Sequence, residues 1–282
     1  MHLEEQVVSL VNRLPPLPES AARLLEAAVQ RNVGPVVEKL LREDPGLCAE
    51  FLRFANSACY AKAGPISTVE EALACADANL FAQMVATAWH EDVLRNTFRE
   101  LPHLDLFFEH SREIRAACRA LASTAGCPPD ECEFYAIAGL LHDIGRLVMI
   151  AAGRQQHTAL FGTTPGEMLS IVHDERTAMG MDHCDVGMFI CRNWNLSPVL
   201  QEGVLRHHSP LVGRDFSRPG AFIFIAHFVA MHDMTGDILA DTVPPEIFTD
   251  LGLTPAAVAM ARRRLTEACA AGWPGGRGGD RR

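Results

Sequence analysis

Residues 139–147 read Gly-Leu-Leu-His-Asp-Ile-Gly-Arg-Leu and place two metal-ligand types side by side in an otherwise apolar stretch. His142 offers a neutral imidazole and Asp143 an anionic carboxylate. A carboxylate buried among hydrocarbon side chains costs free energy unless something compensates its charge. A divalent cation held by further histidines would do so, and the chain has several candidates: His110, His183, His207 and His208. This stretch therefore predicts a metal site inside the core.

The composition favours a globular protein. The chain has 282 residues, 48% of them hydrophobic, a net charge of −10 and a pI near 5.6. This charge disfavours broad attraction to nucleic acid or to an anionic membrane. The nine cysteines contain no Cys-x-x-Cys pair, and the acidic N-terminus does not resemble a signal peptide. With no apolar run judged long enough to cross a membrane, we expect a cytoplasmic protein.

The apolar residues recur at spacings of three and four, which predicts an all-α protein. Consecutive prolines at 15–16 should separate a short first helix from one at 21–30. Capping boxes at 67–70 and 164–167 should begin two further helices, and an apolar segment at 220–231 should form a core helix. Further helices are expected near 44–56, at 82–94 and from Ser197-Pro198 to His207. We expect an N-terminal helical part at 1–100, a second at 101–271 and a flexible tail at 272–282.

The spacing of the histidines indicates which of them could meet. On a helix His142 and Asp143 would lie about 100° apart, so both could reach one ion or bridge two. Gly145 should leave room for a close approach. His183 should begin a helix whose apolar side is Val186, Phe189 and Ile190. His207 should point inward, with His208 on the flank. Mixed imidazole and carboxylate ligands suit Fe, Mn, Zn or Ni, and Fe or Mn is favoured here.

These residues resemble a known family. Leu141-His142-Asp143-Ile144-Gly145 is similar to the core of the HD superfamily of metal-dependent phosphohydrolases, and other segments narrow the resemblance to its HDOD branch of bacterial signalling proteins. Those segments are Leu14-Pro15-Pro16-Leu17-Pro18-Glu19, Asp44-Pro45, Arg53 to Ala58, Ile66 to Ala72, His110-Ser111, Glu175 to Gly187 and Trp194-Asn195-Leu196. They occur in the family's order over residues 10 to 235.

The resemblance implies an all-helical HDOD architecture with an HD-like C-terminal half. It also implies roles for particular residues: His110, His142, Asp143, His183, His207 and His208 as ligands of one or two divalent transition metals, and Glu175 as a partner that orients a ligand histidine. Were the enzymatic mechanism intact, Asp143 would bridge two ions, and Arg146, placed where active relatives often have lysine, would contact a phosphate; a helix-capping role for Arg146 is the alternative.

Two features depart from the enzymes of the superfamily. Ala226-His227 stands where those enzymes have alanine and aspartate, so His227 could ligate only as a neutral imidazole, and a hard cation such as Mg²⁺ should bind less well. Asp233 lies six residues further on, on another helix face, and is not expected to replace it. In addition, no GYP-like segment follows the double histidine, which weakens the case for a cyclic-dinucleotide phosphodiesterase.

Three functional interpretations follow. The first is an HDOD signalling module with an HD-like metal site that acts through protein partners or senses a nucleotide or phosphate ligand. The second is an active metal-dependent phosphatase or phosphodiesterase on a nucleotide-type substrate. The third is a metal-free all-α protein whose buried histidines pair with carboxylates. The sequence predicts neither nucleic-acid nor membrane binding, and it leaves the oligomeric state open.

Overall fold

A computed structural model of the chain describes residues 3–15, 19–29, 33–43, 48–49, 51–52, 55–56, 68–75, 91, 93–101, 104–153, 165–230 and 236–270. The protein is all-α, as predicted. In the described part of the first 100 residues, the helices with defined bounds are α1 (Leu3–Arg13), α2 (Glu19–Val29), α3 (Val33–Glu43) and α5 (Val69–Cys75). Those that follow are α7 (Leu104–Thr124), α8 (Pro129–Leu141), α9 (Ile144–Gly153), α10 (Pro165–Met179), α11 (His183–Asn193), α12 (Pro198–Arg206), α13 (Arg218–Ala230), α14 (Gly236–Thr242), α15 (Pro245–Leu251) and α16 (Pro255–Ala270).

The only sheet in the described part of the chain is a small hairpin between α12 and α13. Strands β1 (Leu211–Val212) and β2 (Asp215–Phe216) pair antiparallel, with Leu211 opposite Phe216. Gly213, in the turn between them, has a φ of +63°, a conformation that glycine adopts without steric cost.

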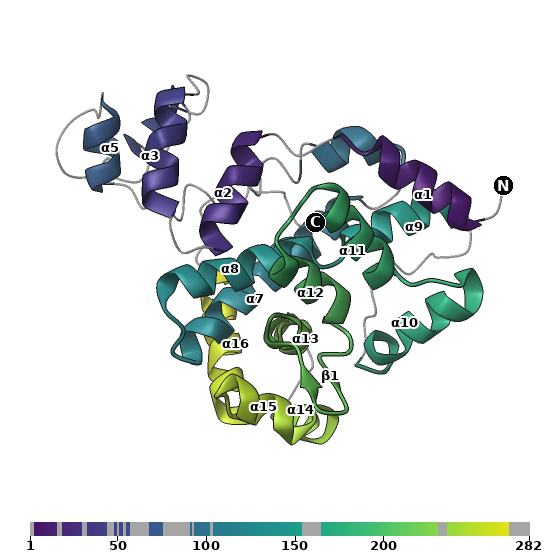
Figure 1. The fold of residues 1–282 in the computed structure, drawn as a ribbon. Coiled ribbons are helices and arrows are strands. Elements are labelled where there is room, and N and C mark those ends of the chain that lie inside the picture. Colours follow the sequence, from purple (N-terminus) through teal and green to yellow (C-terminus); the bar gives the residue numbers. More distant parts are fainter. Residues whose placement is uncertain are drawn as a thin grey trace.

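Helix α13 lies at the centre of the second half and is seen end-on in Figure 1. Its residues from Pro219 to Val229 are all buried, as expected for a helix that is apolar on every side. It packs against α7, α8, α12, α15 and α16. Because α13 carries His227, this central position brings that histidine to the core, where the predicted metal site should lie.

Helices α8 and α9 follow each other closely and together form a long apolar segment. By length and composition, Glu131–Ala152 could span a membrane, contrary to the sequence-based expectation, but 89% of its apolar window is buried inside the protein. Helix α7 covers α8 along its length, and α11 packs on α9. The segment therefore behaves as the core of a globular protein.

The N-terminal helices pack onto this second half. Helix α1 contacts α9 and α11, and α2 contacts α8, whereas α3 and α5 lie at one end of the molecule (Figure 1). The Nε1 of Trp194, just after α11, donates a hydrogen bond to the carbonyl of Pro15 at 3.1 Å, and Asn193 Nδ2 donates one to Val11 O at 3.5 Å. Two segments that carried the family resemblance, 180 residues apart, thus meet at the end of α11. The boundary predicted near residue 100 stays a prediction.

Several expected helix starts are confirmed. Ser197 caps α12 by accepting a hydrogen bond from Leu200 N, and α10 begins at Pro165. The capping box at the start of α5 is displaced by one residue from the prediction: Thr68 Oγ1 accepts from Glu71 N, and Thr68 N donates to a Glu71 carboxylate oxygen, each at 3.2 Å. The expected helix near 44–56, most of the one at 82–94, Thr164, Asp233 and the tail at 272–282 lie outside the described residues.

Candidate metal centre

The His142-Asp143 pair occupies the turn between α8 and α9. The expectation that both residues lie on one continuous helix is therefore wrong. Helix α8 ends at Leu141 and α9 begins at Ile144. His142 nevertheless keeps right-handed helical dihedral angles (φ −54°, ψ −41°), so the apolar periodicity continues across the break and the sequence does not reveal it. Both side chains are fully buried.

Gly145 brings the helix of His183 against this turn. A Cβ atom at Gly145 would lie 2.0 Å from the carbonyl oxygen of His183 and 2.6 Å from the backbone nitrogen of Gly187. Only glycine permits this approach of α9 to α11. The prediction that Gly145 leaves room is therefore confirmed, and the neighbour it accommodates is the backbone of α11.

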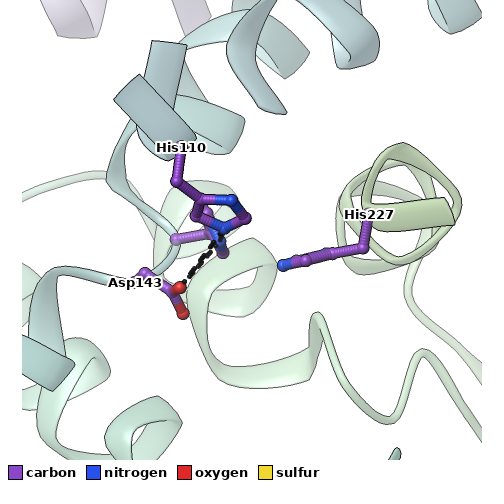
Figure 2. A group of neighbouring side chains, drawn as sticks. His110, Asp143 and His227 are labelled. Carbon is purple, nitrogen blue, oxygen red and sulfur yellow. Dashed lines mark hydrogen bonds and ion pairs between the residues drawn. The ribbon is translucent and has the colours of Figure 1, made fainter. Parts of the chain in front are cut away.

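One group of ligand atoms surrounds Asp143 Oδ2. His142 Nε2 lies 3.2 Å from this oxygen and His110 Nε2, from α7, 3.5 Å. His227 of α13 completes the group, whose ligand atoms all lie within 4.8 Å of one another. Figure 2 shows His110 and His227 directed toward Asp143 from two different helices. We refer to these four residues as the first ligand group.

A second ligand group surrounds the other oxygen of Asp143. His183 Nε2, at the start of α11, lies 3.3 Å from Asp143 Oδ1, and His207 Nε2, just after α12, lies 3.5 Å from it. His208 brings a further ring nitrogen within the same 4.8 Å limit. Asp143 is thus common to both groups, with one carboxylate oxygen facing each.

The hydrogen bonds of the imidazole rings fix where their lone pairs point. Nδ1 of three rings lies 2.7–2.9 Å from a backbone carbonyl, that of Gly139 for His142, Val204 for His207 and Ile223 for His227. Because a carbonyl oxygen only accepts, each Nδ1 must carry the proton, and the Nε2 of each neutral ring presents a lone pair to the centre.

Glu175 orients the fourth ring in the same way. Its carboxylate lies 2.6 Å from His183 Nδ1 and also accepts from the backbone N–H of His183 at 2.9 Å. The Nε2 atoms of His183 and His207 then lie 3.1 Å apart with a lone pair on each. This contact cannot be a hydrogen bond between neutral rings, whereas a cation between the two nitrogens would satisfy both.

Burial keeps the rings neutral. Desolvation lowers the pKa of His142, His183 and His207, and it brings the pKa of His208 and His227 well below the usual histidine range. Burial alone would raise the pKa of Asp143, but the charge of Arg146 and the contacts with the surrounding histidine rings outweigh it, so this pKa lies well below its usual value. The centre therefore combines one carboxylate with neutral imidazoles, which is the protonation state that a metal ion requires.

The unsatisfied atoms of the centre test whether these residues fit a metal. Neither carboxylate oxygen of Asp143 accepts a hydrogen bond of good geometry, and both ring nitrogens of His208 are buried without a partner. Arg146 Nε, 3.1 Å from Asp143 Oδ1, offsets the charge of the carboxylate. It cannot satisfy the imidazole lone pairs, because these face one another. One or two cations, each bound by a ligand group, would satisfy both oxygens of Asp143, the facing imidazole lone pairs and one ring nitrogen of His208. The residues therefore fit a metal centre.

The structure brings together all of the histidines predicted as ligands, and it corrects two side-chain positions, those of Phe189 and His208. Phe189, expected on the apolar side of α11, is 43% exposed, whereas Val186 and Ile190 are buried as predicted. His208 was expected on the flank, yet its ring packs against those of His183 and His207, with centroids 5.0 Å and 4.4 Å away. Phe189 is displaced because α11 turns its buried face toward α9.

Sequence reasoning missed Cys184. Its Sγ lies 3.6 Å from His183 Nε2 and 4.0 Å from His207 Nε2, beside the second ligand group. The available signal was its position directly after a candidate ligand. Cys184 and His208 also line a cavity of about 310 Å³, together with Arg176, Asp182 and Arg206.

The comparison with known proteins defines the class. The family model of the HDOD domain matches residues 14–210, so the chain belongs to the HDOD family. No curated protein matches the chain.

Three solved structures are similar in fold. An HDOD domain protein of unknown function from Geobacter sulfurreducens is 20% identical, with a TM-score of 0.63 over 95% of this chain and 96% of that one. A candidate phosphohydrolase from Shewanella amazonensis SB2B is 21% identical, with a TM-score of 0.57 over 93% and 94%. A candidate signal transduction protein from Marinobacter aquaeolei VT8 is 18% identical, with a TM-score of 0.66 over 95% of this chain and 64% of that one.

Proposed function

We propose that this HDOD protein is a signalling module whose second half holds a dinuclear metal centre bridged by Asp143. The observation that carries the proposal is that two ligand groups share this one carboxylate, with one oxygen facing each. The first ion would be bound by His110, His142 and His227, and the second by His183, His207 and His208. If only one of the two ligand groups binds an ion, the proposed centre is mononuclear.

The ligand chemistry supports a transition metal. Six imidazoles share one carboxylate in the two groups, and imidazole suits Fe, Mn, Zn and Ni better than Mg²⁺. Arg146, paired with Asp143, adds a fixed positive charge that opposes the binding of any cation, so the imidazole ligands would supply most of the affinity.

The signalling role is supported by the packing of the N-terminal helices. Helix α1 contacts α9, which follows the Asp143 turn, and α11, which begins at His183. A protein partner that binds the N-terminal helices would therefore act on elements that hold the metal ligands. The similar fold of the Marinobacter protein, named as a candidate signal transduction protein, agrees with this role. Protein partners and a cytoplasmic location are part of the proposal.

A second candidate function is phosphohydrolysis, favoured by the cavity beside the second ligand group. Bound ions would supply a nucleophilic water of lowered pKa and polarise a phosphoryl oxygen. In this interpretation Asp143 holds the centre together, Glu175 keeps His183 in its ligating tautomer, and Arg146 sets the charge beside the bridging carboxylate. Arg176 and Arg206 line the cavity, but each already pairs with an aspartate, Asp182 and Asp215 respectively. The Shewanella protein is named as a candidate phosphohydrolase.

One experiment separates these functions. The full chain is purified without chelator, its metals are measured by elemental analysis, and it is assayed against a panel of phosphomonoesters and phosphodiesters beside Asp143→Ala. The signalling module is supported if the wild type contains one to two transition-metal ions per chain, Asp143→Ala loses them, and neither protein hydrolyses any of the phosphoesters. Turnover that Asp143→Ala abolishes supports the hydrolase. A protein that takes up no metal and keeps the thermal stability of a metal-treated sample refutes both.

A further inference from the structure

Cys184 is the second residue of α11 and directly follows the ligand His183. Its side chain is 3% exposed. Its sulfur lies 3.6 Å from His183 Nε2, and 3.8 and 4.0 Å from the two ring nitrogens of His207. The sulfur therefore lies beside the two Nε2 atoms of the second ligand group, about as close to Nδ1 of His207 as to its Nε2.

These distances match those between ligands of one ion. Zinc bonds are about 2.0–2.1 Å to histidine nitrogen and about 2.3 Å to cysteine sulfur, so a tetrahedral ion holds a nitrogen and a sulfur ligand about 3.6 Å apart. The same geometry places two nitrogen ligands about 3.4 Å apart. The observed S···N separations of 3.6 and 4.0 Å and the N···N separation of 3.1 Å lie within about 0.4 Å of these values.

A thiol hydrogen bond does not account for the arrangement. Cys184 has a single S–H proton and could satisfy at most one of the two facing Nε2 atoms. His208 adds an independent observation, since both of its ring nitrogens are buried in the same group without a partner. A shared cation satisfies the lone pairs of His183, His207 and His208 together, and the sulfur is placed to join them.

We propose that Cys184 Sγ is a ligand of the second ion, so that this half of the centre is a mixed sulfur, nitrogen and oxygen site. On binding, the thiol releases its proton to solvent and the thiolate forms the bond to the divalent ion, with no change in oxidation state. Thiolate ligation favours a soft or borderline ion, which makes the second site selective for Zn²⁺ or Fe²⁺ over Mn²⁺ and Mg²⁺. The inference rests on the metal centre proposed above.

Cobalt(II) tests the inference because its spectrum reports ligand type separately from occupancy. The full-length protein is stripped of metal, loaded with Co²⁺ and compared with Cys184→Ala and Cys191→Ala. Cys191 is the matched control, since it lies on the same helix, is fully buried and packs in the apolar core. Cys184→Ser serves as a second variant if the alanine protein does not fold.

We expect the wild type and Cys191→Ala to show a near-ultraviolet sulfur-to-cobalt charge-transfer band together with visible d–d bands. Both Cys184 variants should lose the charge-transfer band while the d–d bands of histidine-bound cobalt remain. X-ray absorption of the Zn²⁺ form should show sulfur at about 2.3 Å only when Cys184 is present. Visible d–d bands without the charge-transfer band in the wild type, or a band that survives in Cys184→Ala, would overturn this inference alone. Failure to bind cobalt at all would overturn the metal centre and this inference with it.

Discussion

Replacing Gly145 with alanine should disrupt the metal centre without altering any ligand. The added Cβ would lie 2.0 Å from the carbonyl oxygen of His183, whereas ordinary contact begins at 3.4 Å. Helices α9 and α11 would have to separate by about 1.4 Å. That shift is several times the roughly 0.2 Å tolerance of metal–ligand distances, and it falls between Asp143 and His183. We therefore expect Gly145→Ala to bind fewer metal ions than the wild type.

The same clash should lower stability. Overpacking costs about 1–3 kcal/mol, with the upper end expected here because the obstructing atoms are backbone atoms of His183 and Gly187. The better helix propensity of alanine offsets about 1 kcal/mol of this loss. A net loss of about 2 kcal/mol would lower the Tm of a chain of this size by roughly 3–4 °C.

The assay measures Tm and bound metal for the wild type, Gly145→Ala and Gly34→Ala. Gly34 lies in α3, and a Cβ there would meet no atom within 4 Å, so its substitution should leave metal content unchanged and stability equal or slightly higher. Circular dichroism at room temperature checks that Gly145→Ala is still helical. A Gly145→Ala protein with the Tm and metal content of the wild type would refute the proposed role of the α9–α11 contact.

Three further predictions concern the charges around the centre. Glu175→Gln should weaken metal binding by about 10–100-fold, measured by competition with a chelator, because the carboxylate no longer stabilises His183 as a ligand; an unchanged affinity would contradict this role. His227→Asp adds a carboxylate to the first ligand group, so calorimetry should show Mn²⁺ binding tightened by about tenfold or ~1.4 kcal/mol. Equal Mn²⁺ affinity of the wild type and the variant would argue against His227 facing the ion. The metal-stripped protein should lose stability as the pH falls below about 6.5, by up to about 1.4 kcal/mol per pH unit for each buried ring. The reason is that the pKa of each such histidine is lower in the folded than in the unfolded chain. Urea midpoints that stay constant from pH 7.5 to 5.5 would exclude this loss of stability.

The sequence was sufficient to predict the helical class and the histidines that gather around Asp143, because both depend on residue types. Apolar spacing identified α13 as a core helix, and the metal-ligating character of histidine and aspartate identified the members of both ligand groups. Glu175 was placed correctly through the family resemblance, and its 2.6 Å contact with His183 agrees with an orienting role.

The arrangement of these residues depends on backbone geometry that residue types do not encode. The break at His142 keeps helical dihedral angles, so periodicity runs through it. The separation of the ligands into two groups depends on which carboxylate oxygen of Asp143 each helix faces. Cys184 was missed because an isolated cysteine has many roles, and only its distance from His183 distinguishes this one.

Helix α11 joins the N-terminal segment to the metal centre through its two ends. At its beginning lie His183 and Cys184, and beyond its end Trp194 is bonded to Pro15. Eleven residues of α-helix span about 16 Å and move nearly as a rigid rod. A partner that binds the segment around Pro15 and shifts α11 would also change the affinity of the protein for the metal. By thermodynamic reciprocity, the metal would then change the affinity of the protein for that partner by the same factor. Measuring partner binding with and without metal would then give the coupling free energy between the two ends of one helix.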